Sequence, residues 1–407
     1  MSTPAIATAA AAGANAGVDA PGRVESIDLV RGIIMILMAL DHTRDFFGVI
    51  AISPTDVAHA SVALFFTRWI THICAPVFFL LTGTSACLSG RRRTVSGLSW
   101  LLLTRGAWLI ALELTLVRCF GYQFNFDYRV TLLVVLWALG WSMVALAALV
   151  RLPRGGVLTF GVVMIAAHNL LDPIRASMLG AFAPIWSMLH APGIVLATPQ
   201  HTVFAAYPLI PWIGVTAVGY GLGDLYRRNA TERRTYLLRL GIMSTLAFVV
   251  LRFVNVYGDP SRWRVQRVPV ATLLSFLNTT KYPPSLLFLL MTLGPAALLL
   301  WLFDRRTPSA LRPAVVFGKV PLFYFVLHLA LIHALAVLVC DARYGDARWM
   351  FESPRLDAYP FTQPPGWGYS LLTVYILWAS VVLMLYPACR WYGRIKSRRR
   401  DWWLSYL

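Results

Sequence analysis

The stretch RVESIDLVRGIIMILMALDHTRDF, residues 23–46, is the most informative part of the sequence. Its middle, residues 32–40, is uninterrupted apolar sequence, and ionisable residues stand on both sides of it. A helix rises about 1.5 Å per residue, so about 20 apolar residues cross the roughly 30 Å hydrocarbon core of a bilayer. We therefore predict that this stretch belongs to a membrane-spanning helix with several ionisable groups below the membrane surface.

Similar apolar segments recur along the chain. They predict an all-α fold, a polytopic transmembrane helix bundle of about ten spans, at residues 29–50, 63–90, 98–119, 130–150, 155–171, 204–225, 237–257, 284–303, 314–339 and 368–389. An eleventh, re-entrant or interfacial segment is the alternative interpretation of residues 176–197.

The composition agrees with a membrane protein. Of 407 residues, 58% are hydrophobic and 13% are charged, and this charged share is about half that of an ordinary soluble domain. Soluble surfaces need charge, so the composition excludes a soluble enzyme. The net charge of +18 raises nucleic-acid binding as a second hypothesis.

The positions of the basic residues decide between these hypotheses. Most of the 36 Lys and Arg residues lie in loops that are cytoplasmic if the N-terminus is cytoplasmic, as the positive-inside rule requires. We therefore predict that both termini are cytoplasmic and that the chain binds no nucleic acid. An Ala-rich, disordered tail at residues 1–22 precedes the membrane domain at residues 23–390. A basic tail at residues 391–407 follows it and can contact anionic lipid.

The first predicted span carries a polar stripe. On a helix Arg31, Met35, Met38, His42 and Asp45 share one face, and His42 lies roughly 16 Å beyond Arg31.

Asp41 points away from His42, and it is better placed to pair with Arg44, three residues later.

The next two spans add further ionisable groups. Arg68 and His72 share a face of the second span with Pro76, which should kink the helix just past His72. Arg105 and Glu113 share a face of the third span.

Five costly polar groups therefore concentrate in three consecutive spans: Asp41, His42, Arg68, His72 and Glu113. Such groups inside a membrane usually serve function. For His168, His328 and His333, packing against a neighbouring helix is the competing interpretation, and Arg118 and Arg44 could simply reach the membrane surface. The five scattered cysteines form no metal-binding motif, so we predict no metal.

The motif Arg23-x-x-Ser26-x-Asp28-x-x-Arg31-Gly32 resembles the heparan-alpha-glucosaminide N-acetyltransferase family of transmembrane acyltransferases. The likeness continues at residues 68–83, 136–140, 207–214 and 321–324, and so covers most of residues 23–390. The family includes a lysosomal enzyme and many bacterial membrane proteins. The resemblance implies a multi-pass protein of the bacterial inner (plasma) membrane.

The resemblance also implies an activity: acetyl-CoA donates an acetyl group on the cytoplasmic side, and an amino sugar or glycan accepts it on the other side. A histidine is the base, and in the lysosomal enzyme it lies in a His-Ala-Ser sequence that His59-Ala60-Ser61 matches here. This chain also has His42 where the animal enzyme has asparagine. The base is therefore either His42, which we prefer, or His59, and N- and O-acylation both stay open.

The remaining polar residues receive roles around this reaction. Arg31 and Arg105 are expected to hold the phosphates of acetyl-CoA. His72 and Arg68 are expected to polarise the carbonyl or hold the acceptor, with Glu113 in support. Arg118 and Lys281 lie near the outer side, where Pro- and aromatic-rich segments form either a membrane-interface belt or a sugar-binding surface.

A secondary transporter of a small polar solute is the alternative function, because five plus five spans would form two inverted halves. However, the segment that would correspond to the first span, residues 204–225, is uncharged until Asp224. The sequence is compatible with a homo-oligomer but does not set the oligomeric state.

Overall fold

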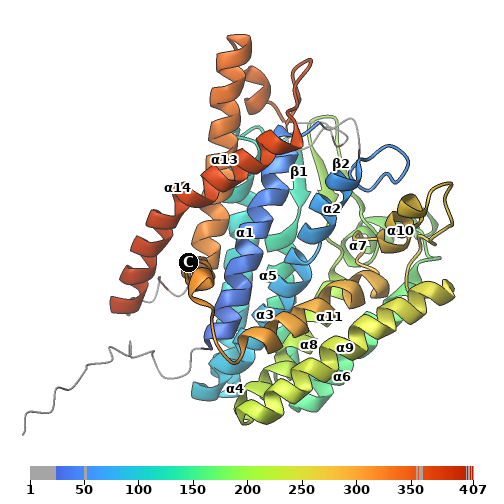
Figure 1. Cartoon of the computed structure of the whole chain (residues 1–407), viewed down its shortest axis with the longest axis vertical. Helices are drawn as coiled ribbons and strands as arrows, with labels where there is room; N and C mark the ends of the chain where they lie inside the picture. Colours follow the sequence, from blue (N-terminus) through green and yellow to red (C-terminus); the bar gives the residue numbers. More distant parts are fainter. Residues whose placement is uncertain are drawn as a thin grey trace, which may run out of the picture.

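The computed structural model describes residues 24–49, 53–353, 356, 361–399, 401, 404 and 406. Long helices packed side by side make up most of it, with α1 near the centre (Figure 1). These helices are α1 Glu25–Phe47, α2 Val62–Thr71, α3 Cys74–Ser89, α4 Val95–Leu112, α5 Val135–Leu149, α6 Arg154–Ala167, α8 Leu209–Leu222, α9 Ala230–Val254, α11 Leu286–Phe303, α13 Pro321–Tyr344 and α14 Leu371–Arg398. The predicted tail at residues 1–22 lies outside the described residues.

Short elements connect the long helices. The helices among them are α7 Ala183–Leu189, α10 Pro269–Leu277 and α12 Arg312–Lys319. A π-helix, η2 Glu113–Tyr122, continues α4. The short 3₁₀ helices are η1 Gly90–Arg92, η3 His168–Leu171, η4 Ala176–Met178, η5 Gly180–Phe182, η6 Gly223–Arg227, η7 Ser309–Leu311 and η8 Arg348–Phe351.

Each of the ten predicted spans contains a helix. Seven helical segments of the described chain are long and apolar enough to cross a membrane, and they make this an integral membrane protein. The other three predicted spans contain α1, which carries more ionisable residues, and the shorter helices α5 and α8, with 15 and 14 residues. The number of spans that cross the bilayer and the side on which each terminus lies stay predictions.

Several predicted segments differ from the structure in their boundaries. The predicted span 314–339 begins in α12, which ends at Lys319. Val320 is not helical, and α13 starts at Pro321. Helix α14 continues to Arg398, into the predicted basic tail. The alternative eleventh segment, residues 176–197, forms η4, η5, α7 and part of a sheet rather than one continuous helix.

A small sheet corrects the purely α-helical prediction. Its strands are β1 Val130–Leu133, β2 Gly193–Ala197 and β3 Thr202–Ala205, in the order β1-β3-β2. β1 pairs in parallel with β3, and β2 pairs with β3 in the antiparallel direction. Residues 130–133 were predicted to begin the fourth span, but they pair with β3 instead, and α5 starts at Val135.

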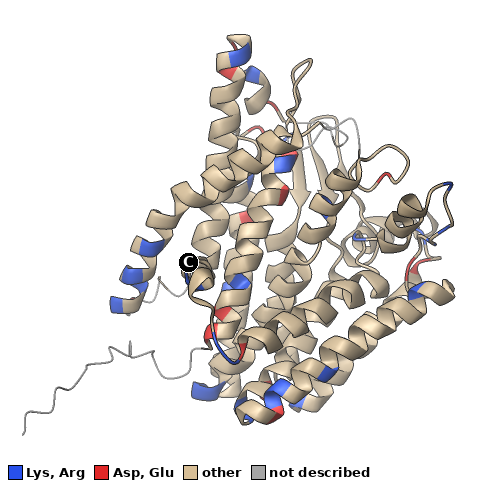
Figure 2. Cartoon of the chain, viewed as in Figure 1, with Lys and Arg blue, Asp and Glu red and all other residues tan. Residues whose placement is uncertain are grey.

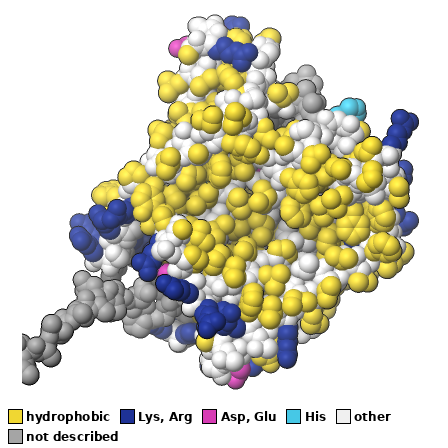
Figure 3. Space-filling view, in the orientation of Figure 1, with side chains coloured by type: hydrophobic (Ala, Val, Ile, Leu, Met, Phe, Trp, Pro, Cys, Tyr) yellow, Lys and Arg dark blue, Asp and Glu magenta, His cyan; other side chains and the backbone are white. Residues whose placement is uncertain are grey.

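The charged and apolar side chains separate along the helices. Lys and Arg gather at the lower ends of α4, α9 and α14 in Figure 2, which we call the arginine-rich end. The face shown in Figure 3 is mostly hydrophobic between the two ends. Exposed apolar residues on α9 and α14, such as Phe253 and Leu383, agree with a surface that faces lipid.

Glycines allow the central helices to approach each other closely. A Cβ atom on Gly32 of α1 would lie 1.8 Å from the carbonyl oxygen of Ala314, in α12. A Cβ atom on Gly83 of α3 would lie 2.0 Å from the carbonyl oxygen of Thr216, in α8. Small residues at such crossings let helix backbones touch inside a membrane.

We predict that Gly83→Ala destabilises the protein by about 1–3 kcal/mol, because the added methyl group forces α3 and α8 apart. The melting temperature of the purified protein in detergent measures this change. Gly155→Ala is the matched control, since a Cβ atom there meets nothing within 4 Å. Equal melting temperatures for the two variants would contradict the predicted close contact.

Candidate functional site

His42 lies on α1 beside a second histidine, His328 of α13. The distance from His42 Nδ1 to His328 Nε2 is 2.7 Å, and the distance from His328 Nδ1 to the carbonyl oxygen of Tyr324 is 3.0 Å. Because a carbonyl only accepts, His328 Nδ1 carries a proton, and in a neutral ring its Nε2 then accepts. His42 Nδ1 must therefore be the donor, which leaves Nε2 of a neutral His42 with a free lone pair.

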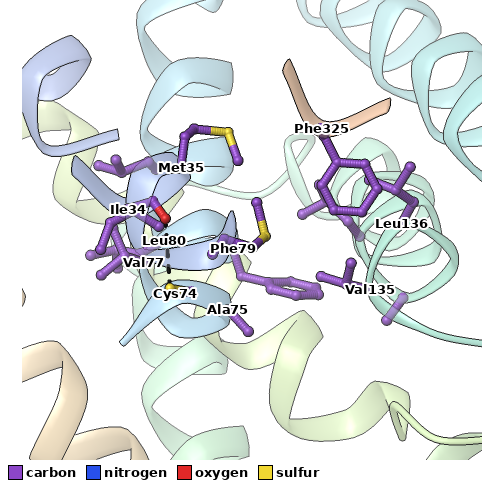
Figure 4. Packing of buried hydrophobic residues seen from close by; sticks show 14 of the residues in the cluster. Ile34, Met35, Cys74, Ala75, Val77, Phe79, Leu80, Val135, Leu136 and Phe325 are labelled. Carbon is purple, nitrogen blue, oxygen red and sulfur yellow. Dashed lines mark hydrogen bonds between the residues drawn. The ribbon is translucent and has the colours of Figure 1, made fainter. Parts of the chain in front are cut away.

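A cavity of about 430 Å³, which we call the His42 cavity, lies against this histidine. It is lined by residues of α1, α2, α3, η2, β1, α5, β3 and α13, and by the loop that contains Lys281 and Tyr282. Figure 4 shows Ala75, Val135, Leu136 and Phe325, which form part of its apolar wall. Cys74 also lines it, and the Cys74 thiol donates to the carbonyl of Ile34, which ties the start of α3 to α1.

The charged wall of the His42 cavity is an ion cluster centred on Asp41. Arg68 Nη1 donates to Asp41 Oδ1 at 2.6 Å, and the Thr71 hydroxyl donates to the same oxygen at 2.9 Å. Arg44 Nη1 lies 2.9 Å from Asp41 Oδ1, so the predicted pairing of Asp41 with Arg44 is confirmed. Arg44 also pairs with Asp45, so two carboxylates balance the two guanidinium groups, which makes burial of these charges tolerable.

A second cavity, of about 330 Å³, lies at the arginine-rich end, and we call it the basic cavity. Four cationic residues line it: Arg31, Arg105, Lys319 and Lys396. Arg31 also donates to Ser85 at 2.9 Å and lies 3.2 Å from Asp28. No acidic residue of the described chain lines this cavity, so it is suited to an anion.

The two cavities follow each other along the same helices. Phe78 of α3 lines both of them. Three further helices each contribute to both: α1 with Arg31 and Met38, α5 and α13 with apolar residues. The predicted stripe of α1 therefore runs from the basic cavity, at Arg31, to the His42 cavity, at Met38, His42 and Asp45.

Four sequence-predicted residues do not line either cavity. The second span is broken after Thr71, as Pro76 predicted, and His72 is buried against the ring of Phe288. His59 lies on an exposed loop and bonds Asp56 at 2.7 Å, which lowers the pKa of the Asp56 carboxyl. Glu113 accepts the backbone N–H groups of Leu136 and Trp137 at the start of α5.

Arg118, the fourth of these residues, binds the loop at residues 123–129, between η2 and β1. Its guanidinium donates to Asn125 and lies 3.3 Å from Asp127 and 4.2 Å from the ring centre of Tyr128. Burial acts to raise the pKa of Asp127, but hydrogen bonds from Ser353 and from the backbone and side chain of Arg129 lower it to about 2.

Sequence reasoning missed part of the site. It named His328 among the histidines for which packing is the competing interpretation, but it could not pair His328 with a residue 286 positions earlier. It also missed the phenol groups of Tyr122, Tyr207 and Tyr282, which line the His42 cavity. Of the predicted residues, Asp41, His42, Arg68 and Lys281 line the His42 cavity, and Arg31 and Arg105 line the basic cavity.

The comparison with known proteins gives the family. No curated protein matches the chain significantly. The family model described as heparan-alpha-glucosaminide N-acetyltransferase, catalytic, matches residues 23–257, which is more than half of the 407 residues. This match contains α1, with the motif that carried the resemblance, and every helix through α9. The chain belongs to the heparan-alpha-glucosaminide N-acetyltransferase family of membrane acetyltransferases.

Proposed function

We propose that the protein transfers the acetyl group of acetyl-CoA, bound in the basic cavity, to an amino or hydroxyl group of a sugar or glycan bound in the His42 cavity. The observation that carries this proposal is the pair of cavities. One is cationic and the other contains an imidazole with a free lone pair, and Phe78 lines both of them. A donor and an acceptor that enter from opposite ends can therefore meet at one histidine.

The donor side is supported by charge and by distance. Arg31, Arg105, Lys319 and Lys396 offer charge-assisted hydrogen bonds to the phosphates of acetyl-CoA. Along α1, Arg31 and His42 are separated by roughly 16 Å, given the rise of a helix. The slender pantetheine arm of the donor would lie along this part of α1 and bring the thioester to Phe78 and His42.

The reaction needs a base and a dry site. Nε2 of His42 would take the proton of the acceptor amine or hydroxyl as the acceptor attacks the acetyl carbonyl carbon. The new C–N or C–O bond forms, the C–S bond breaks, and the CoA thiolate leaves. The protonated His42 then returns its proton to this thiolate. The apolar wall around Phe78 and Phe325 limits water, which would otherwise hydrolyse the thioester.

The acceptor side is supported by the groups that line the His42 cavity. Arg68 and Lys281 offer donors to sugar oxygens, and the rings of Tyr122, Tyr207 and Tyr282 offer apolar faces. Asp41 acts through Arg68, whose guanidinium it holds, rather than by orienting the His42 ring. We place the end of the protein opposite the arginine-rich end, and with it the acceptor, on the extracytoplasmic side.

We predict that His42→Ala lowers acetyl transfer at least about 100-fold, because removal of a general base costs 10²–10⁴-fold. Release of CoA and transfer of label from labelled acetyl-CoA measure the rate in purified protein. His59→Ala is the control, since its side chain is exposed and lies outside both cavities. If His59→Ala abolishes transfer and His42→Ala does not, the assignment of the base is reversed.

The same protein preparation tests the alternative function. A protein that binds no acetyl-CoA and instead carries a solute across the membrane of liposomes would be a transporter.

His328 is predicted to be a positioning residue for His42. His328→Ala should lower kcat about 10- to 100-fold with little change in KM, because the His42 tautomer is no longer fixed. His328→Gln should recover part of this loss, because its carbonyl oxygen can accept from His42 Nδ1. A merely structural role for His328 predicts equal losses of kcat in the two variants. The pH–rate profile is a separate readout, and it should shift in His328→Ala.

The basic cavity gives a prediction for the donor. Arg105→Gln should raise the KM for acetyl-CoA about tenfold, since a hydrogen bond to a charged group contributes about 1.5 kcal/mol and 1.4 kcal/mol corresponds to a factor of ten. Arg93→Gln removes the same charge from an exposed position at the same end and should leave KM unchanged. The steady-state rate against acetyl-CoA concentration tests both variants. Equal effects would mean that only the overall charge matters.

A further inference from the structure

We propose that His168, Asp172 and His190 form a binding site for Zn²⁺ or a similar divalent transition-metal ion. The three residues come from different elements: His168 begins η3 at the end of α6, Asp172 follows η3, and His190 follows α7. One potential ligand atom from each lies within 4.8 Å of the other two, and this is the one such group of three in the described chain. The site is separate from both cavities, because none of the three residues lines them.

The distances agree with a zinc site that needs small side-chain adjustments. Zinc binds imidazole nitrogen and carboxylate oxygen at about 2.0–2.2 Å in tetrahedral geometry, which places neighbouring ligand atoms roughly 3.3 Å apart. His190 Nε2 and Asp172 Oδ1 are 3.1 Å apart, so one edge of the tetrahedron already has the required length. The other two pairs of ligand atoms lie within 4.8 Å, and small rotations of the side chains can bring them to the distance that zinc requires.

His168 itself points to a missing ligand. Its side chain is buried, with 2% exposed, and neither ring nitrogen has a hydrogen-bond partner of normal geometry among the described residues. The backbone carbonyl of Pro284 lies close enough to accept a weak hydrogen bond from one ring nitrogen, which leaves the other nitrogen without a partner among the described residues. A buried polar group without a partner is costly. A metal ion on one ring nitrogen, with the other nitrogen directed to Pro284, would remove this cost.

Groups around the three residues resemble the outer shell of a metal site. Asn169 Nδ2 donates to Asp172 Oδ2 at 2.8 Å, which orients the carboxylate and leaves Oδ1 toward His190. Asn169 Oδ1 in turn accepts the backbone N–H of Leu286, at the start of α11. Hydrogen bonds of this kind fix the ligands in established metal sites. Two imidazoles and one carboxylate favour zinc over Mg²⁺ or Ca²⁺, which prefer oxygen ligands.

The position of the site gives the ion a structural role. Pro192, two residues after His190, lines the His42 cavity, and β2 begins at Gly193. A metal bound to His168, Asp172 and His190 would fasten this segment to the end of α6. It would thereby hold one wall of the His42 cavity without taking part in the chemistry, and its binding does not depend on the proposed function.

Metal analysis of the whole protein tests the proposal. The purified protein in detergent is treated with a chelator, exchanged into metal-free buffer, titrated with ZnCl₂ and analysed for bound zinc. We expect about one zinc ion per chain, and at least a tenfold weaker affinity in His168→Gln, Asp172→Asn and His190→Gln. His201→Gln is the matched control, because His201 lies nearby in sequence on an exposed turn and is not part of the group. The proposal is overturned if the wild-type protein binds no stoichiometric zinc, or if the three variants bind it as tightly as the control.

A second measurement needs no variant and so is independent of variant folding. X-ray absorption at the zinc edge of the loaded wild-type protein should show only nitrogen and oxygen neighbours, with scattering from two imidazole rings. Sulfur neighbours would place the ion at a cysteine and would overturn the assignment. The wild-type melting temperature should rise on zinc addition, as expected when an ion binds only the folded state. An unchanged melting temperature at saturating zinc would rule out the fastening role.

Discussion

The ion cluster around Asp41 is the interaction on which the site depends. The Asp41 carboxylate pairs with Arg44 on its own helix and with Arg68 on α2, and the Thr71 hydroxyl donates to it. Asp45 also pairs with Arg44, so two carboxylates balance the two guanidinium groups. Inside a membrane an unpaired charge is far more costly than at an aqueous surface, so these residues must stay together. The cluster therefore fixes α2 against α1 and holds the Arg68 guanidinium at the wall of the His42 cavity, bound to Asp41, the residue that precedes His42.

The same constraint explains how His42 is held. A buried imidazole also needs partners, and His42 finds one in His328, which is anchored by the carbonyl of Tyr324. The backbone carbonyl sets the direction of both hydrogen bonds, because it can only accept. An acidic partner would instead stabilise a charged imidazole. A chain of hydrogen bonds that ends at a carbonyl leaves Nε2 of a neutral His42 as an acceptor, which suits a group that must take up a proton.

Much of the fold was predictable because it depends on local sequence. The apolar segments located every long helix, and the predicted stripe from Arg31 to His42 lies on the face of α1 that lines both cavities. The partners across the fold were not predictable in this way. His72 sits next to a helix break and turns to Phe288, and Glu113 turns to the N-terminus of α5. The spacing of residues within one helix shows which of them share a face, but it does not show which residues of other helices they contact. The strand β1 was missed for the same reason, since its partner β3 lies about 70 residues later.

The site also extends beyond the segment that matches the family model. Residues 23–257 contain Arg31, His42 and Arg68, but Lys281, Tyr324 and His328 follow that segment. The N-terminal helices thus carry the proposed base, and α13 carries the groups that fix its tautomer. Because His42 and His328 touch across the bundle, the later helices belong to the same chemical unit as the first three. A piece of the chain that ends at residue 257 would contain the histidine without the hydrogen bond that orients it.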